Sequence, residues 1–156
     1  MKINCPQNRK GFTLIELLVV IGILAILLAI TLIAINPARQ FSQSNNTQRA
    51  SNVNSILNAI NQYMADNKGA LPPGITTTVA TIAATTFNTL CTALVPTYIA
   101  ALPVDPLVPG AAPITATGCT GTTWTTNYTV QQISGSNRIT VSAPSAELGA
   151  IIAVTR

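Results

Sequence analysis

Hydrophobic residues fill the first part of the chain in one unbroken segment. From Leu17 to Ile35 no residue is charged, and only Gly22 and Thr31 interrupt the aliphatic and alanine residues. At 1.5 Å per residue, this segment makes a helix of roughly 28 Å, close to the ~30 Å hydrocarbon core of a bilayer. The pattern predicts a membrane-spanning helix over residues 12–36, which by itself fits an ordinary anchor or a secretory signal.

A second helix with a different pattern is expected after Asn36-Pro37. Because Pro37 has no N–H for the carbonyl four residues back, the helix has to kink, melt or restart there. Over residues 37–69 apolar side chains recur at three- and four-residue spacing, which predicts an amphipathic helix ending near Lys68 and Gly69. The members of this apolar stripe are Ala50, Val53, Ile56, Leu57, Ile60, Tyr63 and Met64. The opposite face is polar but mostly uncharged, so it could be buried against other helices or simply solvated.

The remaining residues predict a connection followed by a small sheet. Residues 70–122 form the connection, with little regular structure from Leu71 to Thr86 and a short helix between Phe87 and Ala101. Within residues 123–156, bulky and polar positions alternate in three stretches, which predicts antiparallel strands. These stretches are Thr123–Ile133, Arg138–Ala143 and Ile151–Thr155. One apolar face of the sheet would cover the helical stripe, so the expected fold class is α+β, a long N-terminal helix packed on a small antiparallel sheet.

One acidic residue, Glu16, lies where the apolar segment begins. An ionised carboxylate is unfavourable in hydrocarbon, so Glu16 either reaches the headgroups along its flexible stem or pairs with a cation. A basic pair and an unusual glycine–phenylalanine junction come before it, in the order Arg9-Lys10-Gly11-Phe12-Thr13-Leu14-Ile15-Glu16.

Residues 10–20 closely resemble the class III signal of type IV pilins and type II secretion pseudopilins. The resemblance implies that prepilin peptidase cuts between Gly11 and Phe12, removes the leader 1–11 and methylates the new amine of Phe12. It also implies the type IV pilin fold and assembly through Phe12 and Glu16, in which the amine of one copy neutralises the carboxylate of its neighbour. Filaments of this family unwind locally in the helix, and Gly22 and Pro37 would bracket such a segment here.

Charge sets the expected orientation of the chain. Lys2, Arg9 and Lys10 precede the span, which predicts a cytoplasmic N-terminus with the rest of the chain outside. The precursor has eight basic and four acidic residues, and loss of the leader removes three of the basic ones. The mature chain is then nearly neutral, so a nucleic-acid-binding surface is not expected.

The cysteines predict a disulfide. Cys5 would leave with the leader, so Cys91 and Cys119 remain as a pair in a domain outside the cytoplasm. They are either bridged, which we favour, or packed as free thiols. A bridge closing about 29 residues would contribute about 3 kcal/mol, mainly by restricting the unfolded chain.

The chain offers few residues for catalysis or for metal binding. The chain has no His, and its carboxylates are widely spaced in sequence, so we expect neither an enzyme nor a cofactor. The stretch Leu102-Pro103-Val104-Asp105-Pro106 resembles a turn that lies near a calcium site in major pseudopilins. Asp105 is the only carboxylate between Asp66 and Glu147, so a turn-forming role is favoured over calcium binding.

These features favour a structural subunit, a pilin, held in the cytoplasmic membrane as a precursor and then assembled into a cell-surface filament. The resemblance implies that its partners are further copies of itself, prepilin peptidase, an assembly ATPase with its platform, and minor pilins. One alternative is a pseudopilin of a type II secretion system. Another is a membrane-anchored extracytoplasmic binding domain, whose function would not depend on Glu16.

Overall fold

The computed structural model describes residues 11–110 and 112–156. It divides the chain into two compact units, Met1–Ala38 and Arg39–Arg156, and each is described by itself. The basic residues of the leader, together with Cys5, lie outside the described residues.

Helix α1 spans Leu14–Ala34 and is the main element of the first unit. Leucine, isoleucine and alanine form helices readily. The hydroxyl of Thr31 donates a hydrogen bond to the carbonyl of Leu28 at 2.9 Å. The helix is continuous through Gly22, so no break lies at that residue in this structure. A glycine inside a helix keeps its backbone N–H and costs only about 1 kcal/mol, which the neighbouring residues can offset. Unwinding between Gly22 and Pro37 in a filament stays a prediction.

The break expected at Pro37 is present. Helix α1 ends at Ala34, the C-cap residue Ile35 donates its N–H to the carbonyl of Thr31 at 3.1 Å, and helix α2 spans Pro37–Asp66. Proline suits the first position of a helix because the missing N–H would have had no partner there. After Asp66 the chain turns through Lys68 and Gly69, both with positive φ, and the Gly69 N–H donates to the carbonyl of Met64 at 2.7 Å.

Four antiparallel strands form one sheet in the order β1-β2-β3-β4. They are β1 Ala80–Ala83, β2 Thr125–Gln132, β3 Ile139–Ala143 and β4 Ile152–Thr155. The last three strands confirm the prediction, whereas the expectation of little regular structure from Leu71 to Thr86 is wrong. Strand β1 offers only one large side chain to the core, Ile82, so its sequence carries a weak strand signal, and its pairing with β2 supplies the stability.

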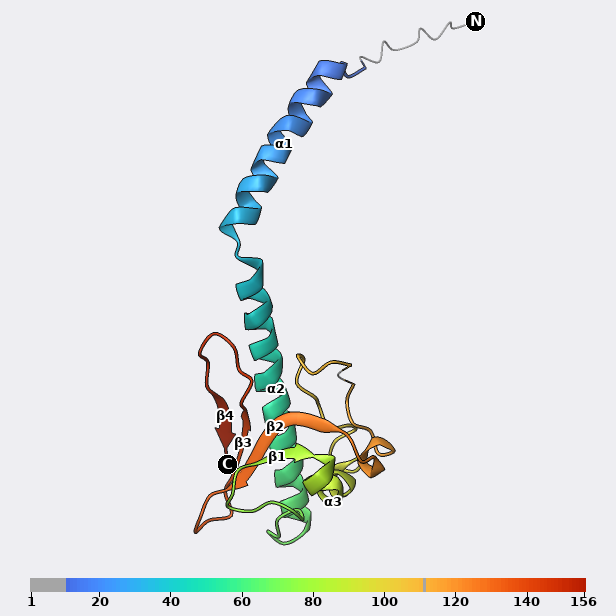
Figure 1. Cartoon of the computed structure of the whole chain (residues 1–156), viewed down its shortest axis with the longest axis vertical. Coiled ribbons are helices and arrows are strands. Elements are labelled where there is room, and N and C mark those ends of the chain that lie inside the picture. The colour runs from blue at the N-terminus through green and yellow to red at the C-terminus, as the bar shows by residue number, and fades with distance from the viewer. Residues whose placement is uncertain (1–10, 111) are drawn as a thin grey trace, which may run out of the picture. The chain divides into compact units, whose positions relative to one another are not determined.

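The core of the second unit lies between α2 and the sheet. The predicted stripe is confirmed, because Val53, Ile56, Leu57 and Ile60 are fully buried. They pack in one cluster with inward-facing sheet residues such as Tyr128 and with helix α3, Ala84–Leu94. Figure 1 shows the strands crossing the C-terminal half of α2, with α3 beside them.

A disulfide joins Cys91 of α3 to Cys119 of the short helix η1, Gly118–Thr120, and confirms the predicted bridge. Both cysteines are fully buried and belong to the core cluster. The residues between 70 and 122 are thus tied to the core by β1, α3 and the disulfide rather than forming a plain connection.

Candidate functional site: the N-terminal segment and a buried arginine cluster

The Gly11–Phe12 junction lies just before the first residue of α1. Neither residue is helical, both are exposed, and no atom lies within 4 Å of the position a side chain would occupy on Gly11. Exposed, non-helical backbone of this kind is what a peptidase requires. The predicted cut therefore falls on accessible chain.

Glu16 caps the helix that contains it. Its Oε2 accepts hydrogen bonds from the Thr13 N–H at 2.9 Å and from the Thr13 hydroxyl at 2.7 Å. In return the Glu16 N–H donates to Thr13 Oγ1 at 3.3 Å, which completes a capping box. The carboxylate thus has hydrogen-bond partners inside its own chain.

The charge of Glu16 is a separate matter. Thr13 offers two neutral donors, and among residues 11–110 and 112–156 no cation forms an ion pair with Glu16. Neutral donors satisfy the lone pairs but leave the net charge in place. A cation brought to this carboxylate would therefore still be attracted.

Apart from Glu16 and Thr31, the side chains of α1 are apolar on every side of the helix. Every large hydrophobic residue from Phe12 to Ile33 leaves at least half of its surface exposed, and Leu14–Ile33 is long and apolar enough to cross a membrane. Water is a poor solvent for such a surface. The segment requires lipid or other apolar helices around it.

A second site lies in the other unit, around a buried arginine that the sequence reasoning missed. Arg49 of α2 is fully buried, and its Nε and Nη2 donate to the two carboxylate oxygens of Asp105 at 2.7 Å and 3.2 Å. Its Nη1 donates to Glu147 Oε2 at 2.8 Å and to Asn46 Oδ1 at 3.0 Å. We call Arg49, Asp105 and Glu147 the Arg49 cluster; it joins α2 to the loop before η1 and to the β3–β4 loop.

Charge and hydrogen bonding within the cluster favour the ionised forms. The hydrogen bond to Asp105 raises the pKa of Arg49 above its ordinary value, with Glu147 adding to the effect. The pKa of Glu147 falls from 4.5 to about 2, first through the hydrogen bond from Arg49 and then through those from Asn45 and Ser42. Arg49 and Glu147 therefore stay charged at neutral pH, and the ion pair between them is kept.

Asp105 uses its carboxylate to hold Arg49. Both oxygens accept from the guanidinium, and Oδ1 also accepts from the Leu107 N–H at 2.9 Å, as expected of a turn-forming aspartate. A calcium ion would have to displace the guanidinium from this carboxylate, and calcium requires several further oxygen ligands. No group of three or more metal-ligating side chains occurs in the part of the chain that the structure describes.

One signal in the sequence pointed to Arg49. Arg49, Val53, Ile56 and Ile60 follow one another at spacings of four, three and four residues, which places all of them on one face of the helix. A charged residue in register with a buried stripe needs a counter-charge from elsewhere in the chain. Nothing local identifies Asp105 and Glu147 as its partners.

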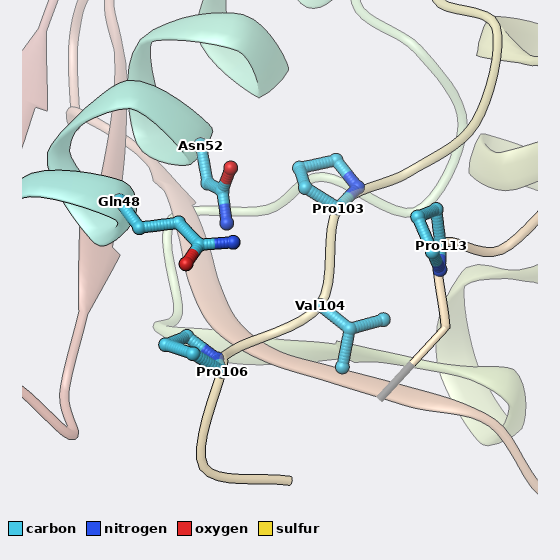
Figure 2. Close-up of a pocket in the computed structure, with 6 residues that line it drawn as sticks. All are labelled: Gln48, Asn52, Pro103, Val104, Pro106 and Pro113. Carbon is cyan, nitrogen blue, oxygen red and sulfur yellow. The ribbon is translucent and has the colours of Figure 1, made fainter. Parts of the chain in front are cut away.

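A shallow cavity of about 230 Å³ lies beside the Arg49 cluster. Figure 2 shows Gln48 and Asn52 of α2 facing Pro103, Val104 and Pro106, with Pro113 at the far side. The Asn52 amide donates to the Tyr128 hydroxyl at 2.9 Å, and none of the lining residues is charged. This cavity offers no group for acid–base or nucleophilic chemistry.

Comparison with known proteins finds a match for one segment of the chain. A family model described as the prokaryotic N-terminal methylation motif matches residues 6–32, which is 27 of the 156 residues. No curated protein and no solved structure matches the chain. The matched segment includes the Gly11–Phe12 junction, Glu16 and most of α1. On this match the chain carries the class III signal of type IV pilin precursors, set on an apolar N-terminal helix of membrane-spanning length.

Proposed function

We propose that this chain is the structural subunit of a type IV pilus-like filament. The leader 1–11 is removed by prepilin peptidase between Gly11 and Phe12, Phe12 is methylated, and the product polymerises through its N-terminal helix. The observation that carries the proposal is the methylation motif on a helix whose large apolar side chains are all exposed. Such a helix is stable in lipid and is equally stable against copies of itself.

Cleavage supplies a cation for Glu16, which has none among the residues that the structure describes. Cutting after Gly11 creates an amine on Phe12, four residues before Glu16 and at the same end of the helix. Thr13 keeps its peptide N–H after the cut, so the capping box survives and still directs the carboxylate toward the helix N-terminus. In a polymer the amine of one copy pairs with the carboxylate of the next and fixes the axial register between copies.

Assembly then exchanges lipid for protein around α1. Extracting an apolar helix from a bilayer is unfavourable until other copies cover it, so the process requires an ATPase-driven machine with a membrane platform. The precursor is a protein of the cytoplasmic membrane, and the filament is extracellular.

Glu16→Gln tests the proposal because it separates charge from hydrogen bonding. Glutamine also completes a capping box with Thr13, so the helix start is preserved while the charge is lost. We expect normal insertion, cleavage and methylation but at least a tenfold loss of filaments, measured by shearing and immunoblotting. Glu16→Asp keeps the charge on a shorter stem and serves as the matched control, with partial recovery expected. Wild-type filament amounts from the Gln variant would contradict charge pairing between copies.

The mature N-terminus and electron microscopy address the alternatives. A methylated Phe12 found by mass spectrometry supports both pilin-like functions, whereas an intact Met1 in the working protein contradicts both. Long surface fibres that contain this chain support a pilus subunit. Methylated protein without surface fibres, in cells that lose secretion when the chain is deleted, points to a pseudopilin.

A further inference from the structure

The turn Glu147–Ala150, at the end of the β3–β4 loop, is held more firmly than an ordinary surface loop. The Glu147 carboxylate accepts from Ser42 at 2.8 Å, from Asn45 at 3.0 Å and from Arg49 at 2.8 Å. The backbone of Glu147 is clamped as well, because its N–H donates to Asn46 Oδ1 at 2.9 Å and its carbonyl accepts from Asn46 Nδ2 at 2.8 Å. Five hydrogen bonds from one helix therefore fix this residue on α2.

The next residue, Leu148, is both strained and exposed. Its φ is 58° and that of Gly149 is 69°, and the Ala150 N–H donates to the Glu147 carbonyl at 3.1 Å, as in a type I′ turn. Asparagine or glycine normally occupies the first central position of such a turn, because a Cβ is disfavoured there. Leu148 nevertheless exposes 56% of its surface, so it gains little from burial inside its own subunit.

Ile151 is a second exposed apolar residue next to the turn. It is 94% exposed, and it directly follows the turn, just before β4. Between Pro144 and Ile151 the only charged residue is Glu147, whose carboxylate is directed toward Arg49. The surface that the turn presents outward is therefore apolar and uncharged.

We propose that Leu148 and Ile151 form a contact surface for a second copy of this chain, and the inference rests on the proposed function. A strained, exposed apolar residue on a firmly held turn is favoured only if something outside the subunit covers it. The turn is tied to the second and third turns of α2, the end of α2 that follows the apolar helix in sequence. A polymer built through α1 consists of copies of this chain, so a second copy is the partner that the proposed function supplies, and every copy uses the same surface.

The Arg49 cluster acquires a role from this assignment. It positions the turn before assembly, so that little freedom is lost when the contact forms. Glu147 and Arg49 are accordingly positioning residues, and the contact itself is made by Leu148 and Ile151.

Leu148→Asn in the full chain is the decisive variant. It converts the turn to Asn-Gly, the preferred type I′ sequence, so the melting temperature of the detergent-solubilised subunit should stay the same or rise. Filament yield should fall severalfold because the apolar contact is lost, and Leu148→Asp should lower it at least tenfold. Val79→Asp is the matched control, since Val79 is equally exposed at 58% but lies before β1, and it should leave filament yield unchanged.

A photocrosslinking side chain placed at residue 148 checks the partner directly. In wild-type-like filaments it should yield adducts between two copies of this chain. The inference is overturned if Leu148→Asn and Leu148→Asp both assemble as the wild type does, or if position 148 crosslinks only to a different protein. If the wild-type chain itself forms no filaments, the proposed function falls together with the inference, and that outcome is distinct from normal filaments in the Leu148 variants.

Discussion

Replacing Arg49 by methionine should strongly destabilise the globular unit. Methionine fills much of the same space along the helix but removes all four hydrogen bonds of the guanidinium. The two carboxylates respond differently. Glu147 is partly exposed and keeps Ser42 and Asn45, whereas Asp105 is fully buried and keeps only the side-chain bond from the Leu107 N–H. The loss therefore arises chiefly from Asp105, left charged in the interior with no counter-ion.

Breaking a buried ion pair by removing one partner costs about 3–5 kcal/mol. For a unit the size of Arg39–Arg156 this corresponds to a fall of roughly 10–20 °C in the melting temperature. Because single domains are stable by only about 5–15 kcal/mol, the change is a large fraction of the total. Thermal unfolding of the full chain in detergent, followed by the fluorescence of the single tryptophan, Trp124, measures it.

Two further variants show whether the stated cause is correct. Arg49→Met combined with Asp105→Leu removes both buried charges and should recover at least half of the lost stability, since an apolar pair of similar volume often replaces an ion pair without loss. Arg39→Met removes another arginine from the exposed surface of α2 and should change the stability by less than about 1 kcal/mol. The reasoning is refuted if Arg49→Met melts within a few degrees of the wild type, or if the double variant is no more stable than the single one.

Two predictions concern pH and the disulfide. The pKa of Glu147 is about 2 in the folded chain against an ordinary 4.5, so its contribution to stability is complete above about pH 4.5 and is lost as the pH falls through 2. The difference in melting temperature between the wild type and Glu147→Gln should therefore shrink as the pH falls over this range. A difference that stays constant with pH would contradict the assignment. Reducing the bond between Cys91 and Cys119, which are 28 residues apart, should destabilise the unit by about 3–4 kcal/mol, measured by chemical unfolding with and without reductant. A Cys91→Ala, Cys119→Ala variant that is insensitive to reductant is the control, and equal curves for the wild type in both conditions would refute the estimate.

Periodicity alone was enough to place the two long helices, because their stabilising contacts follow from local spacing. The stripe through Val53, Ile56 and Ile60 is a pattern of one helix, and the structure buries all three residues. Strand β1 shows where such reasoning stops. Ala80-Thr81-Ile82-Ala83 contains two alanines and one large apolar residue, and it becomes a strand by pairing Ala80 with Val130 and Thr81 with Thr129. That pairing joins residues 48 to 50 positions apart and leaves no local trace.

The Arg49 cluster could not be predicted from the sequence for the same reason. The three members come from positions 49, 105 and 147, and two of them lie in loops whose paths depend on the finished fold. The resemblance near Asp105 even directed attention to calcium rather than to an internal cation. Only the helical register of Arg49 signalled that a counter-charge was required, and it could not identify which carboxylate would supply it.

The charges of Arg49 and Glu16, both in apolar surroundings, thus differ in how they are compensated. Arg49 finds two carboxylates within its own subunit, so its charge is compensated when one copy folds. Glu16 finds only the neutral N–H and hydroxyl of Thr13 in the described part of the chain, which orient the carboxylate without compensating it. A subunit built solely to stay in the membrane would gain by replacing Glu16 with leucine, because lipid favours the apolar side chain. Retaining an oriented, uncompensated carboxylate is favourable only when another molecule brings a cation to it, and the proposed cleavage before Phe12 would give every copy one amine to bring.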